Sequence, residues 1–228
     1  MGQLEKNTVK AENQLKDNDY IRFHIPENAD LRVMFVGNSI TLHGINHDIG
    51  WHNFWGMADS AEEKDYVHVM MEEIKKNHPN TAFCVCQGSK WEVAYRNGTD
   101  VFPQYEMARD FNADIIVIRL VENTKVTPED RELFLDQYGK MVDFLNKSGN
   151  AKLVITDGFW YHPADSFIEE FAATRNLPLV KLGDLGEQEI MRATGLFEHS
   201  GVAAHPGDLG MKNIADRILA CMYENKMI

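Results

Sequence analysis

The sequence has only three cysteines, and it lacks an excess of positive charge, a long apolar run and any low-complexity segment. Three cysteines cannot all pair within one chain. Cys84 and Cys86 alternate along an apolar stretch, at a spacing that does not suit a disulfide bond. Reduced thiols are typical of a cytoplasm, so we expect a cytoplasmic protein, or a secreted one if a signal peptide has been removed.

The charge balance argues against two classes of partner. Lysine and arginine total 23 against 35 for aspartate and glutamate, which gives a formal net charge of −12 at pH 7. An acidic surface disfavours nucleic acid and anionic membranes as partners. No apolar run reaches transmembrane length. We therefore expect neither a nucleic-acid nor a membrane partner.

Short apolar segments alternate with amphipathic ones along the chain. The amphipathic segments predict helices, and the clearest helix begins at Thr127-Pro128, where a cap residue precedes a proline. The alternation indicates an α/β fold, namely a three-layer α/β/α sandwich with a five-stranded parallel sheet. We expect an N-terminal extension over residues 1–30 and one domain over 31–228. The strands are predicted at 31–36, 82–86, 115–120, 153–156 and 179–182.

A candidate nucleophile follows the first predicted strand. Ser39 lies in the turn Gly37-Asn38-Ser39-Ile40-Thr41, at the sheet edge where α/β proteins place their chemistry. A serine hydroxyl attacks a carbonyl only when a base takes its proton, and the resulting oxyanion needs hydrogen-bond donors. The sequence must therefore supply a histidine and donors at the same edge.

Three further residues lie at equivalent positions. Gly88 follows the second strand and offers a backbone amide, and Asn123 follows the third and offers a side-chain amide. His205 directly precedes the last predicted helix and is the candidate base. Taken singly, each residue also fits a plain turn or helix cap.

Together these four residues resemble the SGNH hydrolases, the GDSL-like lipase and acylhydrolase superfamily, which is named after Ser, Gly, Asn and His in four separate blocks. The resemblance extends over 31–218 and implies a flavodoxin-like fold. It implies that Ser39 attacks an ester and that His205 activates water to hydrolyse the acyl-enzyme. The oxyanion would be held by the amides of Ser39 and Gly88 and by the Asn123 side chain, and no metal or cofactor is needed.

The sequence departs from the family pattern in two places. The third block, Val121-Glu122-Asn123-Thr124, replaces the usual Gly-x-Asn-Asp, and Val202 occupies the position of the acid that normally orients the histidine. Some other group must then hold the imidazole in its accepting tautomer. We rank a backbone carbonyl first, which would make a Ser-His dyad, then Glu198, with Asp157 also within range.

Several other side chains have both a structural and a functional interpretation. Arg119 and Glu122 flank the end of the third strand and are expected to pair. His43, His47 and His52 are close in sequence, but the glycines among them disfavour a metal-binding helix, so we expect no metal. Five aromatic residues are candidates for a sugar-binding wall or for core packing: Trp51, Trp55, Trp91, Tyr95 and Trp160.

The resemblance leaves three functions open. The Gly-Asn-Ser-Ile-Thr turn is similar to that of carbohydrate and other small-acyl esterases, which favours an acetyl esterase acting on a small-molecule ester or an acylated carbohydrate. A longer-chain lipase or thioesterase-like acylhydrolase is the enzymatic alternative. Because the usual acid is missing at Val202, a non-catalytic ligand-binding protein on the same fold is the third.

Overall fold

One six-stranded sheet runs through the part of the molecule that the structure describes, residues 10–11 and 14–228 of a computed structural model. The strand order is β1-β3-β2-β4-β5-β6, and β2 to β6 are parallel. All five predicted strands are present, and the predicted α/β fold is confirmed. The strands are β1 (Ile21–His24), β2 (Leu31–Gly37), β3 (Thr81–Gln87), β4 (Ile115–Arg119), β5 (Lys152–Thr156) and β6 (Leu179–Val180).

Strand β1 corrects the predicted count of five strands. It pairs antiparallel with β3, with Ile21 opposite Cys86, and it lies within the predicted extension 1–30. Residues 1–9 and 12–13 of that segment lie outside the described residues. Only Ile21 of the four strand residues is fully buried, so the sequence has too little apolar alternation to predict this strand.

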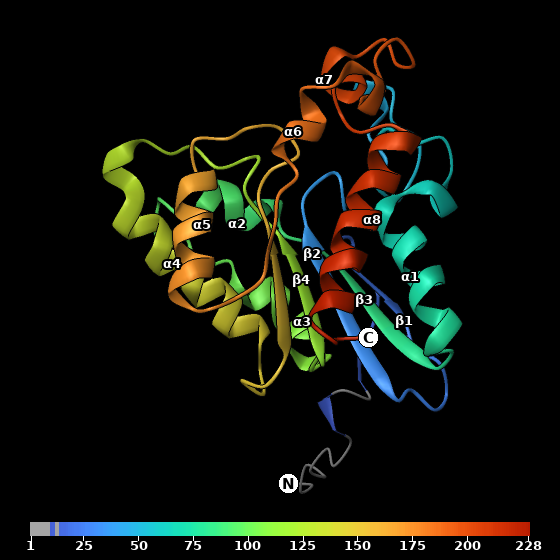
Figure 1. The fold of residues 1–228 in the computed structure, drawn as a ribbon, viewed down its shortest axis with the longest axis vertical. Helices are drawn as coiled ribbons and strands as arrows, with labels where there is room; N and C mark the ends of the chain where they lie inside the picture. The colour runs from blue at the N-terminus through green and yellow to red at the C-terminus, as the bar shows by residue number, and fades with distance from the viewer. Residues whose placement is uncertain (1–9, 12–13) are drawn as a thin grey trace, which may run out of the picture.

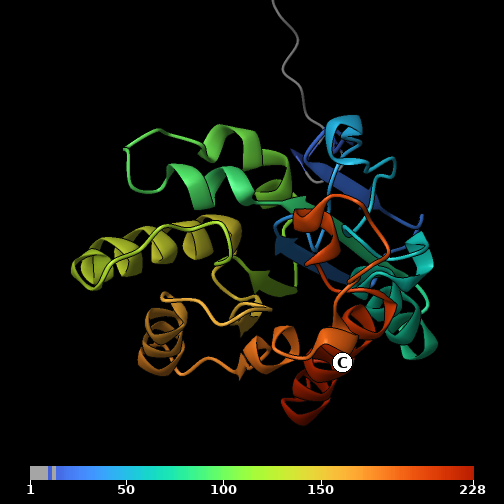
Figure 2. The ribbon, with the colours of Figure 1, turned by 90° about the horizontal axis from the view of Figure 1, so that it is seen from above.

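Helices cover both faces of the sheet and give the three predicted layers (Figure 1). Seen from above, the two groups lie on opposite sides of the strands (Figure 2). Alternate residues of β2 face different layers, since Val33 and Phe35 belong to one apolar core and Met34 and Val36 to the other. Helices α1 (Tyr66–Asn77) and α8 (Asp208–Glu224) cover one face, and α2 (Ser89–Ala94), α3 (Glu106–Asp110), α4 (Arg131–Leu145) and α5 (Asp165–Thr174) cover the other.

Local capping explains where the main helices begin. Asp65 caps α1 by accepting the backbone N–H of His68, and Thr127 and Asp130 form a capping box ahead of α4. None of the described helices has the length and apolar character needed to cross a bilayer. The remaining helical segments are η2 (His47–Ile49), η3 (Glu62–Lys64), η4 (Phe102–Tyr105), η5 (Pro128–Asp130), α6 (Gly183–Gly186), η6 (Glu189–Met191) and α7 (Ser200–Ala203).

The parallel strands end at one edge of the sheet. Ser39 follows β2, Gly88 follows β3 and Asn123 follows β4, so all three lie at this edge. Helices α6 and α7 lie beyond the same edge, at the top of Figure 1. The carboxyl edge of an open parallel sheet is where ligands bind in α/β proteins.

Candidate active site

Ser39 lies on a tight turn two residues beyond the end of β2. The backbone N–H groups of Thr41 and Leu42 both donate to the carbonyl of Asn38, at 2.9 and 3.0 Å. Glycine is required at Gly37, because a Cβ atom there would lie 1.9 Å from Oγ1 of Thr41. The turn therefore fixes the backbone on both sides of the Ser39 hydroxyl.

The hydroxyl of Ser39 meets the imidazole of His205. Ser39 Oγ lies 2.8 Å from His205 Nε2, and His205 Nδ1 lies 2.7 Å from the carbonyl oxygen of Gly201. A carbonyl oxygen only accepts hydrogen bonds, so Nδ1 holds the proton and Nε2 has a free lone pair. The Ser39 hydroxyl then donates to Nε2, and His205 is in the tautomer that a general base requires.

His205 is neutral near pH 7 because its imidazole is shielded from solvent. Burial lowers the pKa of His205 to about 4, although the hydrogen bond to the Gly201 carbonyl acts in the opposite direction. The indole of Trp160 stands edge to face with the imidazole, with ring centroids 5.5 Å apart. A neutral imidazole is able to accept the proton of Ser39.

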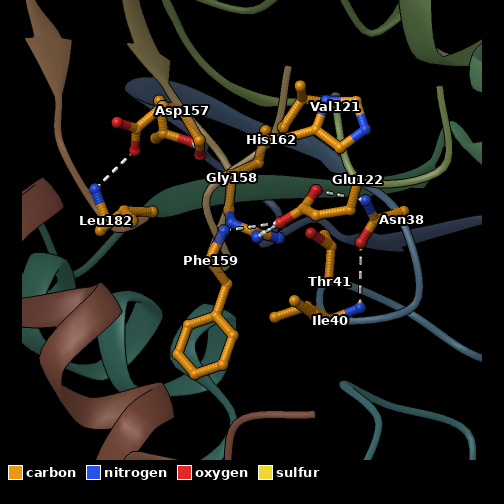
Figure 3. Close-up of polar contacts among 12 residues, drawn as sticks. Asn38, Ile40, Thr41, Val121, Glu122, Asp157, Gly158, Phe159, His162 and Leu182 are labelled. Carbon is orange, nitrogen blue, oxygen red and sulfur yellow. Dashed lines mark hydrogen bonds and ion pairs between the residues drawn. The ribbon is translucent and has the colours of Figure 1, made fainter. Parts of the chain in front are cut away.

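The backbone carbonyl of Gly201 occupies the position where a carboxylate would orient the histidine. Glu198 is exposed and lines a different surface pocket, and Asp157 accepts the backbone N–H of Leu182 at 2.5 Å (Figure 3). Val202 is fully buried in a small apolar cluster. The structure thus does not bring Glu198 to the imidazole, and it places there a backbone carbonyl, the group that we rank first.

Two of the three predicted oxyanion donors remain available. The backbone N–H of Ser39 donates to no acceptor among the described residues, and Asn123 lines the same pocket as Ser39. The N–H of Gly88 instead donates to the Gly37 carbonyl at 2.5 Å, as a continuation of the β2–β3 ladder. This corrects the role predicted for Gly88. Glycine is needed there for packing, because a Cβ atom would lie 2.7 Å from Cδ2 of Leu120.

The predicted pair of Arg119 and Glu122 is present and lies beneath the nucleophile turn. Arg119 is fully buried and donates to Oε1 of Glu122. Glu122 also accepts from Nδ2 of Asn38 at 2.6 Å and from the backbone N–H of Phe159 at 3.0 Å (Figure 3). The ion pair therefore connects β4, the turn after β2 and the loop after β5.

Sequence reasoning missed the buried carboxyl of Glu92 on α2. Only 1% of this residue is exposed, and it accepts from Nδ2 of Asn38 at 3.0 Å and from Nδ2 of Asn123 at 2.6 Å. A glutamate four residues beyond Gly88 has no distinguishing signal in the sequence, since most helical glutamates face solvent. Its burial becomes evident only when α2 and the loops that carry Asn38 and Asn123 are brought together.

The Ser39 hydroxyl opens into a small pocket of about 270 Å³. Polar side chains line the pocket together with an apolar wall formed by Ile49, Met57 and Val202. Typical pockets for drug-sized ligands enclose about 300–1,000 Å³, so this one suits a small group. Besides Ser39, Asn123 and His205, its lining residues are His43, Ile49, Met57, Gln87, Ser89, His199, Gly201 and Val202.

No protein-family model matches the sequence, and no curated protein matches it. Solved structures do match. A two-domain esterase active on acetylated mannans aligns with a TM-score of 0.53 and 18% identity, over 85% of this chain and 48% of its own length. A family two carbohydrate esterase from Clostridium thermocellum, solved with cellohexaose, aligns with a TM-score of 0.54 and 16% identity, over 89% of this chain and 66% of its own.

A third match has nearly the same length as this chain. A protein from Parabacteroides merdae, described as a GDSL-like lipase, aligns with a TM-score of 0.56 and 15% identity, over 86% of this chain and 97% of its own. The chain has the SGNH hydrolase fold. By contrast, it spans about half the length of the mannan esterase. The SGNH fold accounts for the position of Ser39 and His205 at one edge of the sheet.

Most of the five aromatic residues considered for a sugar-binding wall lie in the apolar core. Trp51, Trp91 and Tyr95 are 0%, 1% and 5% exposed, so for these three the structure favours core packing over substrate binding. Trp55 is half-buried and lines a separate pocket. Trp160, against the imidazole, is the aromatic residue of this set that lies beside the dyad.

The loop histidines lie around the site without forming a metal centre. His43 lines the Ser39 pocket, and Nδ1 of His47 lies 2.7 Å from Nδ1 of His52 at the surface. The described residues contain no group of three or more histidine, cysteine, aspartate or glutamate side chains arranged to hold a metal ion.

Proposed function

We propose that this protein is a serine esterase that removes small acyl groups through a Ser39-His205 dyad. The observation that supports this most strongly is the continuous hydrogen-bonded chain from Ser39 Oγ through the imidazole to the Gly201 carbonyl, at 2.8 and 2.7 Å. A hydroxyl, a base in the correct tautomer and a group that orients the base are the parts that nucleophilic acyl transfer requires.

In the proposed reaction, Ser39 Oγ attacks the carbonyl carbon of an ester while its proton moves to His205 Nε2. The Ser39 amide and the Asn123 side chain donate to the oxyanion of the tetrahedral intermediate. The imidazolium then gives its proton to the departing alcohol oxygen, which leaves an acyl-enzyme. Water then loses a proton to His205 Nε2 and attacks the acyl carbonyl, and the imidazolium returns this proton to Ser39 Oγ as the acid is released.

A short acyl group on a carbohydrate fits best. The pocket of about 270 Å³ has room for an acetyl group, and an extended alkyl chain would need a long apolar groove in its place. Two solved structures with the same fold are esterases named for acetylated mannans or for carbohydrates. Both features favour an acetyl ester of a sugar over a lipid or thioester substrate.

Hydrolysis of chromogenic acetate and octanoate esters of one alcohol tests the proposal. The wild-type protein should cleave the acetate with the higher kcat/KM, and Ser39→Ala and His205→Ala should abolish turnover. A preference for octanoate would indicate the lipase-like alternative. A folded wild-type protein that cleaves neither ester would favour the ligand-binding alternative and contradict the proposal.

A further inference from the structure

The buried carboxyl of Glu92 holds two side-chain amides at the carboxyl edge of the sheet. Glu92 lies on α2, which begins directly after Gly88, and it is 1% exposed. Its Oε1 accepts from Nδ2 of Asn38 at 3.0 Å, and its Oε2 accepts from Nδ2 of Asn123 at 2.6 Å. One carboxyl group thus connects the nucleophile turn with the loop that supplies the oxyanion donor.

This contact fixes which end of the Asn123 amide faces the pocket. If the amide were flipped, its Oδ1 would face the carboxylate oxygen of Glu92, and two acceptors cannot share a hydrogen bond. Among the described residues, the Asn123 side chain makes no other hydrogen bond. With one Nδ2 hydrogen on Glu92, the second Nδ2 hydrogen is left for a substrate oxygen in the pocket that Asn123 lines.

The same carboxyl fixes the residue that precedes the nucleophile. The two Nδ2 hydrogens of Asn38 go to Glu92 and to Glu122, at 3.0 and 2.6 Å, and Asn38 Oδ1 accepts the backbone N–H of Ile40 at 3.3 Å. Both ends of the amide are therefore occupied. Because Ser39 is the next residue, the position of its hydroxyl depends on this amide.

We propose that Glu92 is a positioning residue for the esterase reaction, which holds Asn123 and Asn38 so that the oxyanion donor and the nucleophile keep a fixed relation. This inference rests on the proposed esterase function and deepens it. Glu92 touches neither substrate nor reacting atoms, and it acts through the two asparagines. Preorganised donors are the largest contribution to many acyl transfers, so their orientation affects kcat more than KM.

The charges around Glu92 make its protonation, and with it the orientation of the two amides, sensitive to pH. Glu122 is already paired with Arg119, while the hydrogen-bond donors to Glu92 among the described residues are all amides. Burial and the charge of Glu122 raise the pKa of Glu92 to about 7. Two phenols also face it, Tyr105 from η4 and Tyr138 from α4; burial raises the pKa of each, so both remain neutral.

The ionised carboxyl accepts from both amides more strongly than the protonated one. In a protonated Glu92 the hydroxyl oxygen is a weaker acceptor than a carboxylate oxygen, so one of the two hydrogen bonds is weakened and its asparagine is held less firmly. Activity should therefore rise with pH through about 7 as Glu92 ionises. His205 does not produce this limb, because burial lowers its pKa to about 4.

Glu92→Gln, compared with the exposed Glu132→Gln on α4 as the matched control, tests the inference by steady-state kinetics from pH 4.5 to 9. Loss of orientation should lower kcat about tenfold, less than the ~100-fold to 1,000-fold of losing an oxyanion donor, with KM nearly unchanged. The acid limb near pH 7 should disappear in this variant and persist in the control. Unchanged kcat with the limb intact would overturn the inference.

A double-mutant cycle with Asn123→Ala separates positioning from a general structural role. If Glu92 acts through Asn123, Glu92→Gln should lower kcat by a much smaller factor in the Asn123→Ala background than in the wild type. An equal fold-loss of kcat in both backgrounds would show that Glu92 does not act through Asn123. A wild-type protein that hydrolyses no ester would overturn the esterase function and this inference with it, whereas an active wild type with an unaffected Glu92→Gln would overturn the inference alone.

The melting temperature supplies a readout that does not depend on activity. The pKa of Glu92 is raised above its ordinary value in the folded state, so its ionisation lowers the free energy of unfolding as the pH rises toward and through about 7. Glu92→Gln removes this penalty. The melting temperature of Glu92→Gln minus that of the wild type should therefore increase from pH 5 to pH 8. A difference that stays constant over this range would contradict a carboxyl that titrates there.

Discussion

The imidazole of His205 donates its Nδ1–H to the backbone carbonyl of Gly201, 2.7 Å away, and not to a carboxylate. In the Ser-His-Asp arrangement, the acid fixes the tautomer of the histidine and stabilises the imidazolium that forms during attack. A carbonyl performs the first task fully and the second only through its partial negative charge. The catalytic unit proposed here is therefore a dyad with a backbone orienting group.

Glu198→Ala should leave activity nearly intact. Glu198 is exposed and lines a pocket separate from the one containing Ser39, so kcat for acetate hydrolysis should stay within about twofold of wild type, as for most surface substitutions. His205→Ala, measured in parallel, should lose almost all turnover. A loss in Glu198→Ala close to that of His205→Ala would show that the carboxylate reaches the imidazole during the reaction.

Asn123→Ala should reduce kcat by about 100-fold to 1,000-fold with little change in KM, because it removes a donor used mainly by the oxyanion. The exposed Asn150→Ala serves as the control of the same chemical type. Steady-state kinetics on a chromogenic acetate separate the two parameters. A change confined to KM would mean that Asn123 binds the ground-state ester and not the intermediate.

Gly88→Ala should act on stability through packing. The added Cβ would lie 2.7 Å from Cδ2 of Leu120, and overpacking of this kind costs about 1–3 kcal/mol in the free energy of unfolding. Shortening the neighbour in a Gly88→Ala, Leu120→Val double variant should recover part of the loss. Gly44→Ala is the control, because its Cβ would make an ordinary contact 3.4 Å from Phe54. Denaturant titrations measure the free energy of unfolding of each variant. If the loss in the double variant equals the sum of the losses in Gly88→Ala and Leu120→Val alone, this account is contradicted.

Trp160→Ala should raise the pKa of His205 from about 4 toward its ordinary value of 6.5. The indole packs edge to face with the imidazole, so its removal exposes the ring and favours the imidazolium. Proton NMR of the imidazole as a function of pH measures the change directly. An unaltered titration would mean that other groups account for the burial of His205.

The meeting of Ser39 and His205 could be predicted because it depends on chain order. A residue just after β2 and one just before α8 must both lie at the carboxyl edge once the strands are parallel, and the segments at 31–36 and 115–120 have clear strand patterns. The edge strand β1 could not be predicted, since its four residues bury only Ile21 completely.

Backbone hydrogen bonds explain one error at the site and one detail that the sequence left open. The predicted donor role of Gly88 is wrong, whereas the first-ranked backbone carbonyl is present but could not be assigned to a residue. Gly88 continues the register of β3 by one residue, so its N–H meets the Gly37 carbonyl, and the carbonyl of Gly201 approaches His205 through the geometry of α7. Neither contact depends on a side chain that a sequence displays. Burial of Trp91 and of Glu92 on α2 likewise follows from how that short helix packs.

The most direct test of the account is covalent labelling by a fluorophosphonate probe, followed by peptide mass spectrometry. The probe reacts with a serine only when a neighbouring base removes its proton, so the adduct should form on the peptide containing Ser39, be absent in Ser39→Ala and form far more slowly in His205→Ala. A folded wild-type protein without an adduct, or equal labelling of Ser39→Ala, would contradict the dyad.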